Sequence, residues 1–298
     1  MKIVLLAGAS SIHTVRWANG LQGAGHEVHV VSQQIPVDPF VPGVIVHQFP
    51  DRGVLGYFTM VPMVRQLLRV IEPDIVNAHY ASGYGTTARL VNYHPWFLSV
   101  WGSDIYDFPH KSPLHKWLIK KNLRAADKVA STSYCMADEV LTLSPELVDI
   151  SITPFGVDMD RFRIDAPLKE SGNSSIVIGT VKTMAPKYGI STLIRAFVSL
   201  RERLLTGNPT IGQKLRLRLV GDGPQMSELR QLVHELDVAA VTEFVGQVPH
   251  SQVPLELSKL DIYVALSESE SFGVSIIEAG AAGRPVVVSD AGGLPEVT

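Results

Sequence analysis

Glu270 and Glu278 stand seven intervening residues apart, in a segment that is otherwise rich in small and apolar side chains. An ionised carboxylate can only accept hydrogen bonds, so both side chains suit the hydroxyl groups of a sugar or a ribose. A helix is expected to begin near Gly273, and the free N–H groups of its first turn would attract an anion. A nucleotide sugar carries a hexose, a diphosphate and a ribose, and it therefore meets all of these preferences.

The residues around the two glutamates predict one strand–helix–strand unit. The segment divides into an apolar strand, a polar loop, a small-residue helix and a second apolar strand, namely Asp261–Leu266, Ser267–Phe272, Gly273–Ala282 and Pro285–Ser289. This order within about 30 residues is the βαβ unit of a parallel sheet. Glu270 then lies in the loop at the carboxyl end of a strand, where open α/β sheets bind their ligands.

The same segment resembles a known family. Glu270-Ser-Phe-Gly-Val-Ser-Ile-Ile-Glu278-Ala, Gly283-Arg-Pro-Val-Val-Val-Ser and Gly292-Gly293 are similar to the E-x7-E region of retaining glycosyltransferases of family 4, which have the GT-B fold. The resemblance implies that Glu270 orients the donor sugar and Glu278 binds the ribose, and that Phe272 and Gly273 belong to the donor-binding segment. Two solvated surface glutamates are the alternative. The resemblance runs from Lys2 to Val297 and is densest in the second half.

A second loop carries two lysines that the resemblance assigns to the donor. The predicted strand Ile176–Val181 is followed by Lys182 and, five residues later, by Lys187, where the family places an Arg and a Lys that bind the donor diphosphate. Lys182 stands in the arginine position, and a lysine is a point charge without the bidentate fork of arginine. The same resemblance places Val248 near the nucleotide base. Two solvated loop lysines are the alternative.

The first half of the chain begins with another βαβ pattern. The predicted strand Lys2–Ala7 runs into small residues at Gly8 and Ala9, followed by a helix over Val15–Gly23 and a strand over Glu27–Ser32. The small side chains would let the backbone approach a donor phosphate, although a tight turn between strand and helix explains them equally well. The lack of a G-x-G-x-x-G motif in this stretch argues against a dinucleotide site.

His79 and Asp104 are the two candidates for a catalytic group in the first half. His79 ends the predicted strand Pro73–His79, and Asp104 follows the predicted strand Phe97–Trp101, so both belong at the carboxyl edge of the first sheet, facing the cleft. The family commonly has His-Gly-x-Asp where this chain has Trp101-Gly-Ser-Asp104, so the resemblance fixes no role for this position. No general base is assigned, and a structural histidine is an equal alternative for His79.

Length and composition indicate two folded α/β domains. The chain has 298 residues, of which 46% are hydrophobic and 18% charged, which is enough apolar material for two cores. The polar segment Asp165–Ser175 is predicted to be the linker, so the predicted domains are residues 1–166 and 167–298, the second incomplete. A formal charge of −3 excludes a generally basic nucleic-acid-binding protein. The single cysteine, Cys135, excludes a disulfide framework or a cysteine zinc cluster and fits the reducing cytoplasm.

The basic segment Lys111–Lys128 has two interpretations. It predicts a helix with three basic residues on one face and three apolar residues at core spacing, namely Lys116, Lys120 and Arg124, and Leu114, Trp117 and Leu118. The basic face is either simply solvated or attracted to an anionic membrane surface, where each base contributes on the order of 1 kcal/mol. Acceptors in the family are often membrane lipids, so we expect a cytoplasmic protein that is peripheral on the inner face of the membrane.

Together these features predict an α/β, GT-B-like protein with two Rossmann-like domains whose parallel sheets face each other across a cleft. The resemblance implies retaining, metal-independent transfer of a sugar from a nucleotide-diphosphate sugar, with uridine as the expected base, to a lipid-linked or saccharide acceptor. The expected setting is the synthesis of bacterial cell-surface polysaccharide or glycolipid. No cofactor, metal or nucleic-acid partner is expected.

Two other interpretations remain open. A hydrolase or epimerase on the same fold would use paired carboxylates, but it would leave Lys182, Lys187 and the start of the helix without a role. A truncated or vestigial protein would hold a nucleotide sugar without turnover. The sequence stops at Thr298 as a further helix is expected to begin, whereas family members continue. We therefore expect uncovered apolar surface with an unprotected sheet edge, self-association, and weak or no transferase activity.

Overall fold

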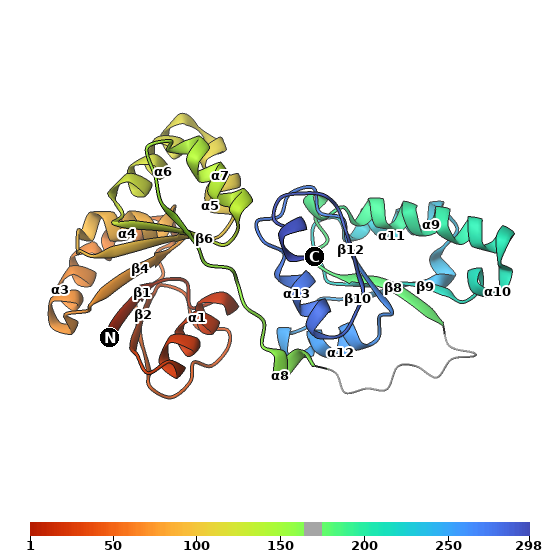
Figure 1. Ribbon diagram of the computed structural model, residues 1–298, viewed down its shortest axis with the longest axis horizontal. Coiled ribbons are helices and arrows are strands. Elements are labelled where there is room, and N and C mark those ends of the chain that lie inside the picture. The colour runs from red at the N-terminus through yellow and green to blue at the C-terminus, as the bar shows by residue number, and fades with distance from the viewer. Residues whose placement is uncertain (164–174) are drawn as a thin grey trace. The chain divides into compact units, whose positions relative to one another are not determined.

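The computed structural model of the protein describes residues 1–163 and 175–298. The chain divides into two compact units, Met1–Phe155 and Gly156–Thr298, and each contains one parallel β-sheet with helices packed on both of its faces (Figure 1). This confirms the expectation of two Rossmann-like α/β units with parallel sheets.

The first unit is built on a seven-stranded sheet in the order β3-β2-β1-β4-β5-β6-β7, with every neighbouring pair parallel. Its strands are β1 Lys2–Leu6, β2 Glu27–Ser32, β3 Val44–Gln48, β4 Ile75–His79, β5 Trp96–Val100, β6 Lys128–Ser131 and β7 Ile150–Ile152. Its helices are α1 Ile12–Gly23, α2 Gly56–Thr59, α3 Val61–Ile71, α4 Gly83–Val91, α5 Ser103–Tyr106, α6 Pro113–Ala125 and α7 Tyr134–Leu143. Val4 and Leu6 of β1 belong to one apolar cluster, and Ile3 and Leu5 belong to another. This strand is buried on both faces, as a central parallel strand should be.

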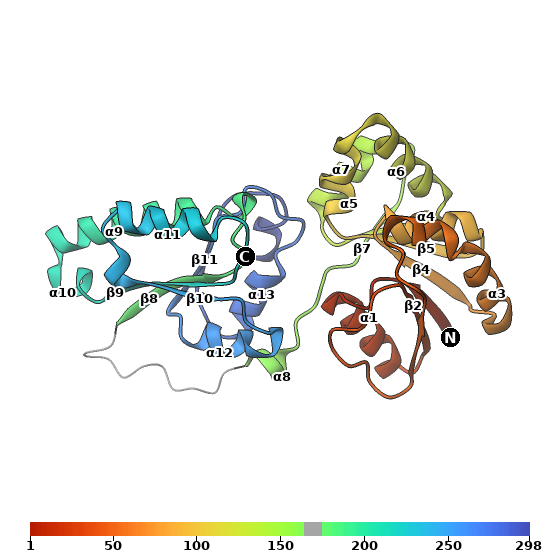
Figure 2. The same ribbon diagram turned by 180° about the vertical axis from the view of Figure 1, so that it is seen from behind.

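The second unit is built on a five-stranded parallel sheet in the order β10-β9-β8-β11-β12. Its strands are β8 Ile176–Val181, β9 Leu215–Val220, β10 Thr242–Gly246, β11 Ile262–Ala265 and β12 Val286–Val288. Its helices are α8 Met159–Phe162, α9 Ile190–Gly207, α10 Pro209–Gly212, α11 Met226–Glu235, α12 Val253–Ser258 and α13 Val274–Ala281. Helices α9 and α11 cover one face of this sheet, and α12 and α13 cover the other (Figure 1 and Figure 2).

In both sheets the strand order reverses beside the first strand of the unit. β1 lies between β2 and β4, and β8 lies between β9 and β11. Open α/β sheets bind ligands outside the carboxyl ends of the strands at such a reversal. The topology therefore singles out the loops after β1 and β4 in the first unit, and the loops after β8 and β11 in the second.

The chain divides between the units after Phe155, ahead of the predicted boundary. Residues Gly156–Arg163, which include α8, belong to the second unit because Phe162 is fully buried in the apolar cluster that also contains Leu257 and Tyr263. The predicted boundary between residues 166 and 167 lies outside the described residues, as does all of the predicted linker except Ser175.

Helix α6 buries a different face from the one that its apolar pattern predicted. Leu114 is 69% exposed and Trp117 is 52% exposed, so the prediction that they face the core is wrong. The buried residues of the helix are Ile119, Asn122 and Leu123. The Asn122 amide donates to the Ala81 carbonyl at 2.7 Å, so a polar side chain anchors this face to the loop after β4. A polar anchor within a buried face is invisible to hydrophobic periodicity.

Candidate functional site

The loops that follow β8 and β11 bring a lysine and a glutamate together. Lys182 comes directly after β8, Glu270 lies in the loop after β11, and Lys182 Nζ is 2.5 Å from Glu270 Oε2. The two side chains are only 12% and 16% exposed. Because β8 and β11 are hydrogen-bonded neighbours, the sheet itself places the two loops side by side. Two predicted site residues are therefore joined by a charge-assisted hydrogen bond.

The surroundings of Lys182 keep its ammonium group charged. Burial acts to lower the pKa of this group, but the charge and hydrogen bond of Glu270, together with Tyr263 and Tyr188, outweigh burial and raise the pKa above its ordinary value of 10.5. Lys182 is therefore protonated at neutral pH. An anionic ligand that reached this point would compete with Glu270 for the same ammonium group.

Lys187 has a different environment from Lys182. It lies in the 3-10 turn Pro186–Tyr188 and is exposed, and its Nζ is 5.2 Å from the centroid of the Tyr188 ring. Lys182 Nζ is 4.7 Å from the same centroid. Within residues 1–163 and 175–298, no ion pair joins Lys187 to a carboxylate. Its charge is therefore available to a ligand.

Backbone contacts fasten the site loops to one another. The Glu268 N–H donates to the Lys187 carbonyl at 2.8 Å, and the Gly293 N–H donates to the Glu270 carbonyl at 2.8 Å. Gly292 has a φ of 55°, and a Cβ atom at this position would lie 2.1 Å from the Glu270 carbonyl oxygen. Only glycine fits there. The Gly-Gly turn after β12 thus holds the backbone of Glu270.

Glu278 has a partner that the sequence did not suggest. It lies in α13 and is 6% exposed, and its Oε1 is 3.0 Å from Nε2 of His250. His250 begins the turn His250–Gln252, shortly after Val248, and Val248 packs against the apolar cluster that includes α13. The predicted ribose-binding and base-binding residues are therefore linked through this turn. A single histidine in a turn carries no pattern from which this contact could have been predicted.

Phe272 and Gly273 form the entry to α13. Phe272 is buried, and Gly273 is the residue before the helix, with a φ of 101°. Leu294 and Val297 lie where a side chain at Gly273 would point. The first free N–H groups of α13 therefore follow directly on the loop that carries Glu270.

In the first unit, Gly8 and Ala9 form the turn between β1 and α1. The Ala9 N–H donates to Ser32 Oγ at 2.9 Å, and a Cβ atom at Gly8 would lie 3.1 Å from Gln34 Oε1. Ala9 is buried and Gly8 is partly buried. The turn is thus packed against polar side chains at the end of β2, and it lies at the reversal of strand order.

His79 is enclosed at the carboxyl end of β4. It is fully buried, and neither ring nitrogen has a hydrogen-bond partner within the described residues. Its ring centroid lies 4.2 Å from that of Trp101 and 6.4 Å from that of Trp17. Burial, with a smaller contribution from His13, lowers the pKa of His79 to about 3. The imidazole is therefore uncharged at neutral pH and is a weak base.

Asp104 joins the loops after β4 and β5. It is 1% exposed, and it accepts backbone N–H bonds from Ala81 at 2.7 Å, Gly102 at 2.9 Å and Trp101 at 3.2 Å. Burial raises the pKa of the carboxyl group, and the backbone N–H bonds offset only part of that rise. The carboxylate is thus occupied in shaping the two loops, and the structure does not place it against His79 by any hydrogen bond between described residues.

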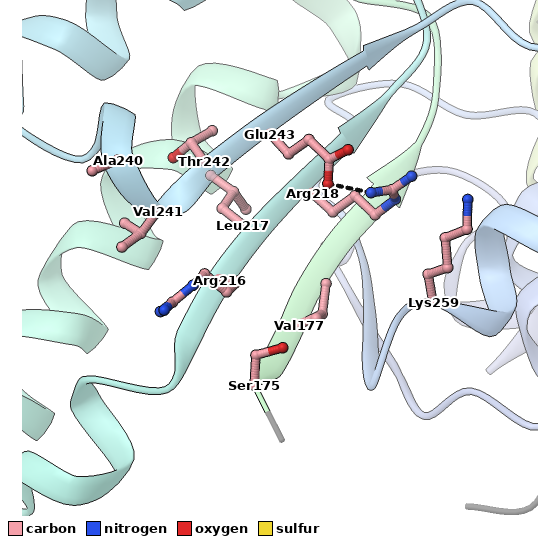
Figure 3. A pocket seen from close by; sticks show the side chains of 10 residues that line it. All are labelled: Ser175, Val177, Arg216, Leu217, Arg218, Ala240, Val241, Thr242, Glu243 and Lys259. Carbon is pink, nitrogen blue, oxygen red and sulfur yellow. Dashed lines mark hydrogen bonds and ion pairs between the residues drawn. The ribbon is translucent and has the colours of Figure 1, made fainter. Parts of the chain in front are cut away.

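The second unit also has a cavity at the opposite end of its sheet (Figure 3). It has a volume of about 380 Å³ and is lined by residues of β8, β9 and β10, by Lys259 and by residues just ahead of β8 and β10. Arg218 of its lining forms an ion pair with Glu243 and another with Glu256, the latter at 2.6 Å. None of the predicted site residues lines this cavity, and the ion pairs of Arg218 give that side chain a structural role.

Asp158 and Asp160 form an Asp-x-Asp sequence at the start of α8. Asp158 caps α8, because its side chain accepts the Arg161 N–H at 3.1 Å. Across the described part of the chain, no group of three or more His, Cys, Asp or Glu side chains is arranged to hold a metal ion.

Two family models match the sequence, one in each half of the chain. Residues 2–133 match the model described as glycosyl transferase 4-like, and residues 162–298 match the model described as glycosyl transferases group 1. Among curated relatives, the teichuronic acid biosynthesis glycosyltransferase TuaC of Bacillus subtilis, named as putative, is 28% identical over 89% of this chain. An N-acetyl-alpha-D-glucosaminyl L-malate synthase of Bacillus anthracis is 24% identical over 97% of the chain. The chain spans 65% of the length of the first relative and 78% of the second.

Solved structures of glycosyltransferases share the fold. A sucrose-phosphate synthase from Thermosynechococcus elongatus superimposes over 99% of this chain and 82% of its own with a TM-score of 0.78, at 19% identity. HepE of Anabaena, in complex with UDP-glucose, superimposes over 100% of this chain and 83% of its own with a TM-score of 0.74, at 20% identity. Both halves of the sequence match glycosyltransferase models and the fold is GT-B-like, and these findings together support a GT-B glycosyltransferase.

Proposed function

We propose that the protein transfers a sugar from a nucleotide-diphosphate sugar to an acceptor hydroxyl, with retention and without a metal, as a member of family 4. The observation that carries this proposal is the junction of the loops after β8 and β11, where Lys182 meets Glu270 and Lys187 stays unpaired among the described residues. A cationic loop beside a carboxylate suits a ligand with a diphosphate next to a hexose. The UDP-glucose complex of the structural neighbour HepE supports a uridine nucleotide as the donor.

Each part of the donor has a proposed partner in the second unit. Lys182, Lys187 and the start of α13 would offset the charge that develops on the leaving diphosphate, which is largely an electrostatic contribution. Glu270 would orient the sugar. Glu278 would bind the ribose, held in place by His250 at 3.0 Å.

The first unit would bind the acceptor. The turn at Gly8 and Ala9 and the loops held by Asp104 lie at the carboxyl edge of its sheet, at or beside the reversal of strand order. His79 is uncharged and enclosed there, and Asp104 is occupied by three N–H donors. The proposal therefore leaves the general base unassigned and gives Asp104 the role of shaping the loops.

Paired variants of the two glutamates test the assignment. Glu278→Gln should weaken UDP binding on the order of tenfold, because it replaces a charged acceptor of the ribose hydroxyls with a neutral one. Glu270→Gln should bind UDP at least as tightly as the wild type, because it releases Lys182 from its ion pair, but it should lower the kcat for the full donor. Calorimetry with UDP and product analysis with UDP-glucose measure the two effects.

The outcomes of this experiment also separate the alternatives. Equal effects of both variants on both measurements would show that the two roles are misassigned. Sugar release without an acceptor would favour a hydrolase, and UDP binding without any turnover would favour a nucleotide-sugar-binding protein. A matching thermal melt of the wild type and both variants is the control for folding.

Helix α6 supports a proposed contact with an anionic membrane on the cytoplasmic side. Its exposed face presents Leu114 and Trp117 next to the exposed Lys116 and Lys121, with Lys121 Nζ 6.0 Å from the centroid of the Trp117 ring. Arg124 is instead bound to Glu146. Apolar side chains among lysines are the pattern of a segment that rests in a lipid interface. The names of two relatives, one in teichuronic acid biosynthesis and one a phosphatidylinositol N-acetylglucosaminyltransferase subunit, agree with an acceptor of the cell surface or the membrane.

Within the described residues, no single helix is long and apolar enough to cross a membrane, and one bent pair, Gly53–Thr59 with Val61–Ile71, would have the length and composition only in combination.

Vesicle binding tests the α6 surface. Wild-type protein should co-sediment with vesicles that contain anionic phospholipid, and binding should fall as salt rises because exposed charges are screened over about 10 Å at 0.1 M. Trp117→Ser should lower the partition several-fold, since it removes the largest apolar side chain of the face. Val148→Ser removes another exposed apolar residue, 98% exposed and outside α6, and should change nothing. If Trp117→Ser and wild type bound the vesicles equally, the face of α6 would be a solvated surface and not a membrane contact.

A further inference from the structure

We infer that Tyr188 is a positioning residue that sets the two lysines of the loop after β8 for a diphosphate group. The inference rests on the proposed function, since it concerns the same donor site. The ring of Tyr188 is the feature that Lys182 and Lys187 have in common.

Both ammonium groups lie over the Tyr188 ring. Lys182 Nζ is 4.7 Å and Lys187 Nζ is 5.2 Å from the ring centroid. A cation within about 6 Å of an aromatic centroid is attracted by the negative face of the ring. The two lysines are therefore held toward one ring, although their charges repel each other.

An aromatic ring holds a lysine without neutralising it. Glu270 already forms an ion pair with Lys182. A second carboxylate in the loop would neutralise the positive charge that attracts a diphosphate. Lys187 has no carboxylate partner in the described part of the chain, so the ring is the group that restricts its side chain. A free lysine side chain loses up to about 2 kcal/mol of rotamer entropy on binding, and prior restriction reduces that loss.

The backbone around Tyr188 is fixed, so the ring can act as a rigid support. The Tyr188 N–H donates to the Ala185 carbonyl at 3.0 Å, and the Gly189 N–H donates to the Pro186 carbonyl at 3.1 Å. The neighbouring Lys187 carbonyl is held by Glu268 from the loop after β11. The ring itself packs against the apolar cluster of the α9 and α11 face. Its position is therefore set by the fold before any ligand binds.

This arrangement predicts a preference for two phosphates over one. A diphosphate can contact both ammonium groups at once, whereas a monophosphate can satisfy only one of them. Without the ring, each lysine should still be able to contact a phosphate, but the two ammonium groups should no longer be restricted to positions that suit one diphosphate. The effect of Tyr188 should therefore appear in UDP binding and be nearly absent from UMP binding.

The test compares wild type, Tyr188→Phe and Tyr188→Leu by calorimetry with UDP, UMP and inorganic pyrophosphate. Tyr188→Phe keeps the ring, so the affinities of this variant for all three ligands should stay within about twofold of those of the wild type. Leucine keeps the apolar packing but removes the ring, so affinity for UDP and pyrophosphate should fall on the order of tenfold while affinity for UMP changes less than about twofold. Thermal melts of all variants check the fold.

A double-variant cycle shows whether the tyrosine acts through a lysine. In a Lys187→Ala background, Tyr188→Leu should cost clearly less UDP affinity than it costs alone, because one of the two supported cations is gone. Equal loss of UDP and UMP affinity in Tyr188→Leu, or no loss of either, would overturn the inference while wild-type UDP binding stands. Failure of wild type to bind UDP or pyrophosphate would instead overturn the proposed function, and the inference with it.

Discussion

Lys182→Ala is expected to lower kcat/KM for the sugar donor by roughly tenfold to a hundredfold. The change removes a cation from the diphosphate, where a charge-assisted hydrogen bond contributes about 1.5–3 kcal/mol. It also leaves Glu270, whose side chain is 16% exposed, without its partner at 2.5 Å. Breaking a largely buried ion pair from one side typically costs about 3–5 kcal/mol. Steady-state kinetics with UDP-glucose and chemical denaturation measure the two consequences.

Two control variants isolate the role of the Lys182 charge. Lys182→Arg keeps a cation next to Glu270 and should retain most of the activity. Lys259→Ala breaks a comparable pair, at 2.6 Å from Glu256, but away from the site, and Glu256 keeps Arg218 as a partner. It should leave turnover unchanged. Wild-type kinetics in Lys182→Ala would show that the pair is structural and has no part in donor binding.

Asp104→Ala is expected to have the largest effect on stability. It leaves three buried N–H groups, those of Ala81, Trp101 and Gly102, without their acceptor. Each unsatisfied buried donor costs about 1–3 kcal/mol, so the loss of one acceptor for all three should lower the free energy of unfolding by roughly 3–9 kcal/mol. That is a large part of the 5–15 kcal/mol typical of a folded protein. Urea unfolding followed by circular dichroism measures it.

Asp104→Asn keeps an acceptor oxygen and adds a test of pH dependence. Burial raises the folded-state pKa of the carboxyl group above its ordinary value of 3.8, so the folded state holds the proton more tightly than the unfolded chain. The contribution of this group to stability is therefore greatest below pH 3.8 and is lost as the pH rises through the folded pKa. As the pH rises through the folded-state pKa, the free energy of unfolding of Asp104→Asn should therefore increase relative to that of the wild type. If the difference in free energy of unfolding between the two proteins stayed constant with pH, the raised pKa of Asp104 would be contradicted.

Apolar strands bounded by polar turns were the most predictable elements. Strands β2 and β8 have the bounds that the sequence predicted. Helix α4 was not predicted, because its sequence contains Gly83, Gly85 and two threonines, which are weak helix formers. It is helical because Tyr84 and Ala88 pack into the core of the first unit, and such tertiary packing overrides local propensity.

Positions at the edges of the sheets were predictable, but side-chain partners were not. The parallel topology placed Lys182 and Glu270 in adjacent loops and His79 at the end of a strand, as the sequence indicated. The contact of Glu278 with His250 and the ring of Tyr188 depend on how loops fold over one another. Residues distant in sequence meet there without any periodic pattern, so a single sequence gives no sign of them.

The fit of Gly292 against the carbonyl of Glu270 limits how this protein can be re-engineered. A donor loop transplanted from a relative would meet a turn shaped for the present backbone, since a Cβ atom at position 292 comes within 2.1 Å of that oxygen. The segments around residues 182–189, 266–273 and 291–293 behave as one module, joined by the bonds of Glu268 and Gly293. Chimaeras that exchange donor specificity should therefore carry all three segments together, and libraries that vary the loop should leave both glycines untouched.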